Sequence, residues 1–353
     1  MSRQRRSNTV HGRHLPFSRA LPAAGLVLAI VVGAAGPASA ASAPSTTNVS
    51  AGPGGITLSS TAVPAGVDSF HFTTTDPKGA DITVFALKGG ATVGQVMHDI
   101  GQSMSHNPKV AGPAIAKVAS EIEAYGGAEL GTPGQAVNVA MSLSGGTYHV
   151  LDAVTMKAST LTVSGGQPST ALPPTAASVT YVGDRFGTGA ALPARGSILV
   201  ANNSSDLHFM QLWPAKPGTT DSQVQAAFQA EAHGQSGAPS FMAGPPSIGM
   251  GVLSPHRRAV LSYAVAPGTY VLVCFIADPD TGIPHAFMGM HKVVTVTTMP
   301  LGAPQTGGGS TAGVQDKGLL GLGGAALTAG VGALLLARRR RQTAVPAHPP
   351  ATR

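Results

Sequence analysis

Between residues 41 and 298, short runs of valine, threonine, tyrosine and phenylalanine alternate with polar positions and end at glycine or proline. A period of two indicates β-strands with one buried face, because successive side chains point to opposite faces of a strand. In the run Thr269–Phe275, for example, Tyr270, Leu272 and Cys274 share one face. The pattern predicts an all-β fold.

Two segments depart from this alternation and predict helices. Residues Ala114–Tyr125 carry three branched apolar side chains at positions i, i+3 and i+7, which lie on one face of a helix. A second helix is expected to begin at Asp221, a suitable N-cap residue, and to stop at Gly234.

The order of these patterns occurs twice along the chain. Ala80–Val96 matches Ser205–Val224, since each is a strand-like run followed by a lysine-containing turn, a threonine and a helix start. Further on, Met141–Val154 matches Ser262–Ile276, and each is followed by a strand rich in threonine and valine. An internal repeat of this length predicts two copies of one structural unit.

The repeat predicts two tandem Greek-key β-sandwiches, each with a helical insertion. We place the first unit at residues 41–166 and the second at residues 178–298. Residues 167–177 between them contain three prolines, which disfavour regular structure and indicate a linker.

The N-terminal 40 residues predict export rather than fold. A basic stretch precedes an apolar run, and Ala38-Ser39-Ala40 provides the small residues of a cleavage site, which together are typical of a secretory signal peptide.

The C-terminal residues predict anchoring at the cell surface. Residues 318–337 are uncharged and long enough to span a membrane, and the arginines of the tail at 338–353 favour a cytoplasmic end. Upstream, in the linker at 299–317, Pro304-Gln305-Thr306-Gly307 resembles a Gram-positive sortase sorting signal, although Ala303 stands where that motif carries leucine. Covalent attachment to peptidoglycan and simple membrane anchoring both remain open.

Charge argues against nucleic acid as a partner. The whole chain carries a formal charge of +7, but residues 41–300 hold 11 basic and 14 acidic side chains, a net charge of −3. This region has no basic patch that could release counterions from a phosphate backbone. We therefore expect partners other than nucleic acid.

The only cysteine of the chain, Cys274, suggests a metal site. An exported protein with one cysteine forms no internal disulfide, so its thiol is either buried and inert or a ligand. His285 and Met290 follow Cys274, and a thiolate, an imidazole and a thioether suit one copper ion. A second histidine is still required, and His208 is the candidate.

The second half resembles the cupredoxin family, in particular the plastocyanin-like domains of secreted bacterial proteins. The residues that carry the resemblance, within Val179–Thr298, are Asn202-Asn203, Leu207-His208-Phe209, Pro267-Gly268-Thr269-Tyr270, Cys274, Pro284-His285 and Gly289-Met290. The resemblance implies that His208, Cys274, His285 and Met290 converge on copper at one end of the sandwich. Ten residues separate Cys274 from His285, a longer loop than in small electron-transfer cupredoxins, and His291 is a competing ligand.

The first half is expected to bind no metal. Aligned on the repeat, Thr83 stands opposite His208 and Asp152 stands opposite Cys274. A histidine followed by a methionine is absent between Asp152 and the last strand of that half.

Two classes of function remain open from the sequence. One is a surface-anchored copper protein that transfers electrons to a redox partner or sequesters copper through Met288, Met290 and the nearby histidines. The other is a metal-free module for adhesion or scaffolding, which binds an envelope protein. We expect no enzyme, because the chain contains neither a His-x-His pair nor a Gly-x-Ser-x-Gly motif.

Overall fold

The computed structural model describes residues 46–166, 171–234 and 239–298. The predicted signal peptide, sorting-like segment, membrane span and basic tail lie outside these residues and stay predictions. Among the helices of the described ranges, none has the length and apolar character needed to cross a membrane.

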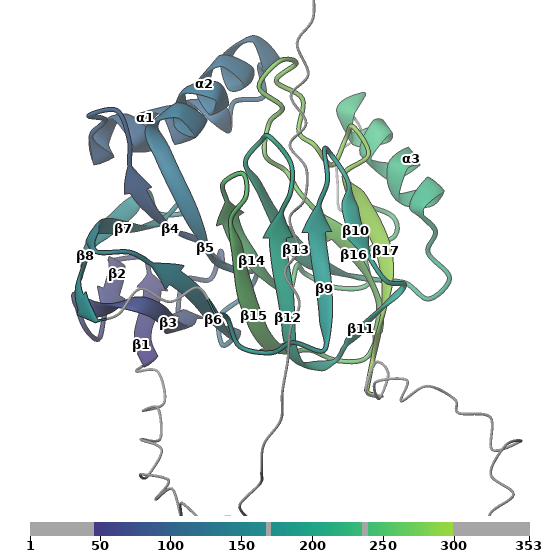
Figure 1. The fold of residues 1–353 in the computed structure, drawn as a ribbon. Helices are drawn as coiled ribbons and strands as arrows, with labels where there is room; N and C mark the ends of the chain where they lie inside the picture. Colours follow the sequence, from purple (N-terminus) through teal and green to yellow (C-terminus); the bar gives the residue numbers. More distant parts are fainter. Residues whose placement is uncertain (1–45, 167–170, 235–238, 299–353) are drawn as a thin grey trace, which may run out of the picture. The chain divides into compact units, whose positions relative to one another are not determined.

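The described residues form seventeen strands and three helices (Figure 1). The elements of the first half are β1 Thr46–Gly52, β2 Gly55–Leu58, β3 Ala62–Thr74, β4 Ala80–Leu87, α1 Val93–Ser103, α2 Pro108–Glu121, β5 Ile122–Leu130, β6 Ala136–Leu143, β7 Gly146–Asp152 and β8 Lys157–Gly166. Those of the second half are β9 Ala177–Tyr181, β10 Phe186–Thr188, β11 Ala191–Pro193, β12 Arg195–Asn202, β13 His208–Ala215, α3 Asp221–Ala232, β14 Ile248–Leu253, β15 Arg258–Ala264, β16 Gly268–Val273 and β17 His291–Thr297.

Both halves use the same strand pairings. In the first, β3 pairs with β6, β4 with β5 and β7, and β7 with β8, all antiparallel. In the second, β12 pairs with β15, β13 with β14 and β16, and β16 with β17, again antiparallel. The prediction of an all-β fold with two tandem β-sandwiches is confirmed.

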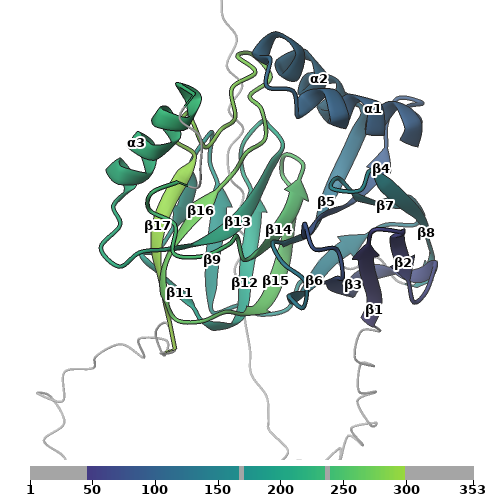
Figure 2. The ribbon, with the colours of Figure 1, turned by 180° about the vertical axis from the view of Figure 1, so that it is seen from behind.

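The two halves share their sheets. Antiparallel pairing of β6 with β15 joins one sheet across the halves, and pairing of β5 with β14 joins the other. Figure 2 shows these strands side by side from the opposite direction. A single core cluster accordingly contains buried side chains of both halves, from Val49 to Val296. Because paired edges leave no free backbone groups, each half protects an edge of the other.

The helical insertions are present, with bounds that differ from the predicted ones. The first half has two helices, and α2 ends at Glu121, although the apolar spacing continues to Ile122. The backbone becomes extended at Ile122 because β5 is a central strand between β4 and β14, and this pairing overrides the helical periodicity. In the second half Thr220 is the N-cap of α3, because its hydroxyl accepts from the backbone N–H of Gln223 in a capping box, and Asp221 is the first helical residue.

Candidate metal centre

Adjacent strands of one sheet bring the first two candidate ligands together. His208 begins β13, and Cys274 directly follows β16. These strands pair antiparallel in the register Gln211↔Val273, so both residues lie at the same end of the pair. Strand alternation placed Cys274 on a buried face. The pairing of β13 with β16 then brings His208 beside it, and these two residues form one half of the candidate site.

The segment between Cys274 and His285 is a closed hairpin rather than an open loop. Its two arms are held by backbone hydrogen bonds from Ala286 N–H to the Cys274 carbonyl at 2.7 Å and from His285 N–H to the Ile276 carbonyl at 2.9 Å. The tip is fixed by Asp278, whose carboxylate accepts from the backbone N–H of Thr281 at 2.6 Å. The long spacing seen in the sequence is thus compatible with a pre-organised ligand, because few backbone torsions remain free.

This hairpin also packs on the helices of the first half. Gly282 lies so close to α2 that a side chain would overlap the carbonyl oxygen of Pro108. A Cβ on Gly112 would in turn approach the backbone of Gly282 and Pro279 at 3.0–3.2 Å. The sequence shows these only as two glycines 170 positions apart, so nothing in it indicates that they meet.

The three side chains converge around one point. Cys274 Sγ lies 3.8 Å from His208 Nδ1 and 3.8 Å from His285 Nδ1. The two imidazole rings have centroids 4.6 Å apart. All three side chains are fully buried, and their donor atoms lie within 4.8 Å of one another. Histidine, cysteine and carboxylate side chains come together in this way at one place among the described residues, and the group found there consists of two histidines and one cysteine.

These distances fit a metal ion between the donor atoms. With a metal–sulfur bond of about 2.3 Å and a metal–nitrogen bond of about 2.0 Å, an angle of about 110–120° separates sulfur and nitrogen by about 3.5–3.8 Å. Two imidazoles and one thiolate in this arrangement are the donor set of mononuclear copper sites. The buried His–Cys–His group therefore fits a copper ligand site.

Electrostatics favour the neutral forms of all three groups when no metal is bound. Burial raises the pKa of the Cys274 thiol to about 12, although backbone N–H groups of Phe209 and Ile276 lower it by donating to the sulfur. Burial, followed by the neighbouring His285, lowers the pKa of His208 to about 3. Burial also lowers the pKa of His285. Both imidazoles keep lone pairs for a metal, and the Cys274 thiol would give up its proton on binding one.

Buried polar residues hold the segment that carries His208. The amide of the fully buried Asn202 donates to the carbonyls of Asp206 at 2.7 Å and Leu253 at 2.8 Å, while its oxygen accepts from Ser204. The ring of Tyr181 packs edge-on against His208 with centroids 5.6 Å apart. Asn202 was part of the sequence pattern, and the structure gives it this positioning role.

Asp184 is a site residue that the sequence did not reveal. Its Oδ1 atom lies 3.5 Å from His285 Nε2, and the two atoms are not aligned for a hydrogen bond. Asp184 belongs to the tight turn between β9 and β10, about 100 positions before His285, and isolated acidic turn residues are common. Burial has the larger effect on the pKa of His285 and lowers it, and the negative charge of Asp184 beside the imidazole opposes this by raising the pKa.

The remaining candidate ligands have different outcomes. Met290 is fully buried in the same core cluster as Cys274, and its backbone N–H donates to the His285 carbonyl at 2.8 Å. Its role as a fourth ligand stays a prediction. His291, the competing candidate, instead contacts α3: its Nε2 lies 2.9 Å from Gln225 Oε1, and its Nδ1 lies 3.7 Å from Asp221 Oδ1.

The corresponding position of the first half has a structural use. Asp152 ends β7 opposite Ile82, and its carboxylate accepts from the backbone N–H groups of Asp81 and Val154, each at 3.1 Å, and from the Thr155 hydroxyl at 2.7 Å. The side chain that replaces cysteine thus ties the end of β7 to its neighbours.

Sequence comparison identifies no relative, and structure comparison finds copper proteins. No family model matches the chain, and no curated protein matches it. Similar solved structures include dithionite-reduced auracyanin from Roseiflexus castenholzii, with 16% identity, coverage of 34% of this chain and 94% of that chain, and a TM-score of 0.22.

Two further structures are similar to this chain at comparable levels. Auracyanin A from Chloroflexus aurantiacus, described as a "blue" copper protein, has 15% identity, coverage of 34% and 96%, and a TM-score of 0.22. The copper nitrite reductase from Nitrosomonas europaea has 11% identity, coverage of 72% and 94%, and a TM-score of 0.18. At these values the likeness says nothing about what this chain binds, and the copper site rests on its own donor atoms.

Because His208 is buried in its neutral form, we predict that the metal-free protein becomes less stable to unfolding at acidic pH. The pKa of His208 is about 3 in the folded state against 6.5 for the ordinary side chain, so below about pH 6.5 the unfolded state binds a proton that the folded state does not. This group alone should lower the free energy of unfolding by about 2 kcal/mol between pH 7 and pH 5. Denaturant unfolding at both pH values measures the change, and His208→Gln should remove that contribution.

The matched control is His98→Gln, which replaces an exposed histidine on α1. This variant should keep the acid sensitivity of the parent protein. If His208→Gln and His98→Gln show the same difference between pH 7 and pH 5, the buried neutral state of His208 is contradicted.

Proposed function

We propose that the protein is an exported, surface-anchored electron carrier in which His208, Cys274 and His285 would hold one copper ion, with Met290 as a fourth ligand. The observation that carries the proposal is the placement of both Nδ1 atoms 3.8 Å from Cys274 Sγ in a fully buried cluster. If the protein were a metal-free module, we would expect the Cys274 sulfur to lie far from both histidines. The two distances argue against that alternative.

The chain's own residues supply a rigid, dry environment. A bound copper ion would supply one-electron chemistry by alternating between its two common oxidation states. The paired strands and the closed hairpin fix the donor atoms, so little rearrangement is needed when the charge of the site changes. The N–H groups of Phe209 and Ile276 stabilise the thiolate, and burial excludes water.

Burial also favours a carrier over an enzyme. All three donor side chains are inaccessible to solvent, so a substrate has no direct path to the metal. Electrons, by contrast, can pass through a covering layer of side chains. We therefore propose that the protein exchanges electrons with a redox partner.

Exposed apolar residues occur in the two chain segments that meet at His285. Three of the four large hydrophobic residues that are exposed in the described ranges belong to the segments around this ring. Val182, 55% exposed, lies in the turn that carries Asp184, and Ile283 and Met288 lie in the segment that carries His285. We propose that these three residues form an apolar patch beside His285 for transient docking of a redox partner.

Electron exchange between protein molecules tests this patch. Ile283→Lys should slow electron self-exchange, measured by NMR line broadening in mixtures of the reduced and oxidised copper protein, by about tenfold or more. The reason is that each copy would have to remove a charged lysine from water at the contact, where it now presents an apolar side chain. The visible spectrum should not change, because Ile283 does not contact the metal.

The matched control is Thr160→Lys, which adds the same charge at an exposed position of β8 in the first half. It should leave self-exchange within about twofold of the parent rate. Equal rates in Ile283→Lys and Thr160→Lys would contradict the use of this patch.

Copper sequestration receives less support from the geometry. A methionine- and histidine-based Cu(I) trap would need Met288 and His291 to turn toward the site. His291 instead contacts Gln225 and Asp221, and Met288 is 42% exposed, with its sulfur accepting from the Thr281 hydroxyl at 3.5 Å.

Export and anchoring are part of the proposal on sequence grounds. The basic and apolar stretches of residues 1–40 support export, and the uncharged segment at 318–337 with its arginine tail supports anchoring. Release of the protein from intact cells by muramidase would indicate attachment to peptidoglycan, whereas release by detergent alone would indicate a membrane anchor.

A further inference from the structure

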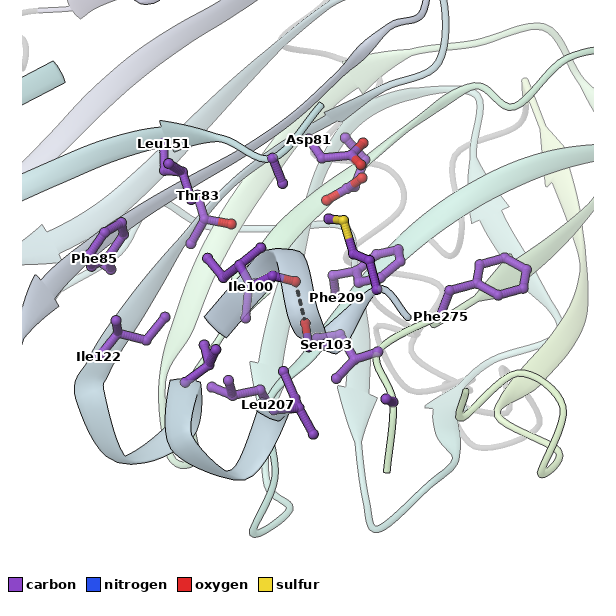
Figure 3. A pocket seen from close by; sticks show the side chains of 18 of the residues that line it. Asp81, Thr83, Phe85, Ile100, Ser103, Ile122, Leu151, Leu207, Phe209 and Phe275 are labelled. Atoms are coloured by element: carbon purple, nitrogen blue, oxygen red, sulfur yellow. Dashed lines mark hydrogen bonds between the residues drawn. The ribbon is translucent and has the colours of Figure 1, made fainter. Parts of the chain in front are cut away.

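A cavity separate from the metal cluster lies between the helices of the first half and strands of both halves. Its volume is about 300 Å³. Most of its lining is apolar, and Figure 3 shows Phe85, Ile100, Ile122, Leu151, Leu207, Phe209 and Phe275 around it. Small-molecule sites in proteins are typically apolar cavities of this size or larger with a few polar groups.

The polar groups of the cavity are acidic. Asp81 and Glu129 both line it, and their side chains hydrogen-bond to one another across the paired strands β4 and β5. Glu129 is only 4% exposed. Burial raises the pKa of both carboxyl groups, and the mutual hydrogen bond favours one shared proton. Because a hydrogen bond between two carboxyl groups requires at least one proton, the pair carries at most one negative charge in its apolar surrounding.

Among the described residues, no cationic side chain lines the cavity beside this pair. The neighbouring groups that act on the pair, Asp152 and Cys274, are negative when ionised. Lysine, arginine and histidine are absent from the described residues that line the cavity. A buried anion without a counter-charge is costly, which favours a ligand that brings a positive charge.

A second polar group is available for the same ligand. Thr83 lines the cavity and is 9% exposed, and its hydroxyl forms no hydrogen bond with the described residues. Figure 3 shows Thr83 among the side chains that line the cavity, together with Asp81 and Ile100. A hydroxyl that lines a cavity can accept a hydrogen bond from an ammonium group bound there.

We propose that this cavity binds a small apolar molecule that carries one amine, with the ammonium group at Asp81, Glu129 and Thr83 and the apolar part among the aromatic and aliphatic side chains. A volume of about 300 Å³ is about ten times that of one water molecule in the liquid, so the ligand has about ten heavy atoms. This function goes beyond electron transfer and does not require copper.

Calorimetric titration of the metal-free full chain tests the proposal. The probes are n-octylamine, which is protonated at pH 7, and 1-octanol, which has the same apolar chain without the charge. We expect one octylamine per chain and an affinity about tenfold or more above that of octanol. Equal affinities, or no binding of octylamine, overturn the proposal.

Two variants and a control locate the binding. Asp81→Asn combined with Glu129→Gln should remove the preference for the amine, while Glu231→Gln, which neutralises an exposed carboxylate on α3, should preserve it. Ser103→Phe, at a half-buried position of α1 that lines the cavity, tests the volume independently of the carboxylates. It should weaken both probes about tenfold or more, and unchanged octylamine binding in this variant also overturns the proposal.

Discussion

The Cys274→Ser variant is expected to lose the intense visible band of the copper-loaded protein and to bind copper about 100-fold or more weakly. A serine hydroxyl does not ionise near neutral pH and offers a poor donor to copper, whereas the thiolate is the soft ligand of the cluster. Changes outside the first shell already cost about 10- to 100-fold in metal affinity, so loss of a ligand should exceed that range. Competition with a chelator of known affinity measures the change.

Met288→Leu is the matched control, because it removes a sulfur close in sequence to the site but exposed at the surface. It should retain the visible band and the copper affinity of the parent protein. If Cys274→Ser keeps one tightly bound Cu(I) and Met288→Leu loses it, the protein is a thioether-based trap and the proposed cluster is not the site.

The second large effect is expected from Gly282→Ala, in the hairpin that leads to His285. Gly282 has φ of +71°, and a Cβ there would overlap the Pro108 carbonyl oxygen, so alanine forces the hairpin away from α2. Strain of the backbone and loss of this packing should together lower the free energy of unfolding of the metal-free protein by about 3 kcal/mol or more. Copper affinity should fall as well, because the same hairpin positions His285.

Gly89→Ala separates packing from backbone strain. Gly89 has φ of +60°, but the space around its added Cβ is open. This variant should cost only about 1 kcal/mol, the usual price of a left-handed alanine, and should leave copper affinity unchanged. Denaturant unfolding of both variants gives the comparison, and equal losses would show that contact between the hairpin and α2 contributes nothing.

The sequence alone was sufficient to predict the β-strands and the residues that form the His–Cys–His cluster. Alternation from Tyr270 to Cys274 placed the thiol on a buried face, and the residue pattern with its cupredoxin resemblance named His208, Cys274 and His285 as ligands. These signals are carried by short stretches of sequence, which is why they are visible without a structure. The structure brings together three of the four predicted ligand side chains, His208, Cys274 and His285.

Contacts between segments far apart in the chain could not be predicted from the sequence. Asp184 reaches His285 from a separate turn, and Gly282 meets Pro108 across the two halves. The pairing of β5 with β14 likewise depends on complementary edges that carry no distinct residue signature. Local patterns also misplaced the end of α2, where strand pairing outweighed helical spacing at Ile122.

The central claim is most directly tested by titrating the metal-free full chain with Cu(II) while recording the visible spectrum and the EPR signal. We predict an intense visible band that saturates at one copper per chain, with the narrow copper hyperfine splitting that accompanies a thiolate ligand. Saturation at one copper without a thiolate band, or no retained copper, would contradict a site formed by His208, Cys274 and His285.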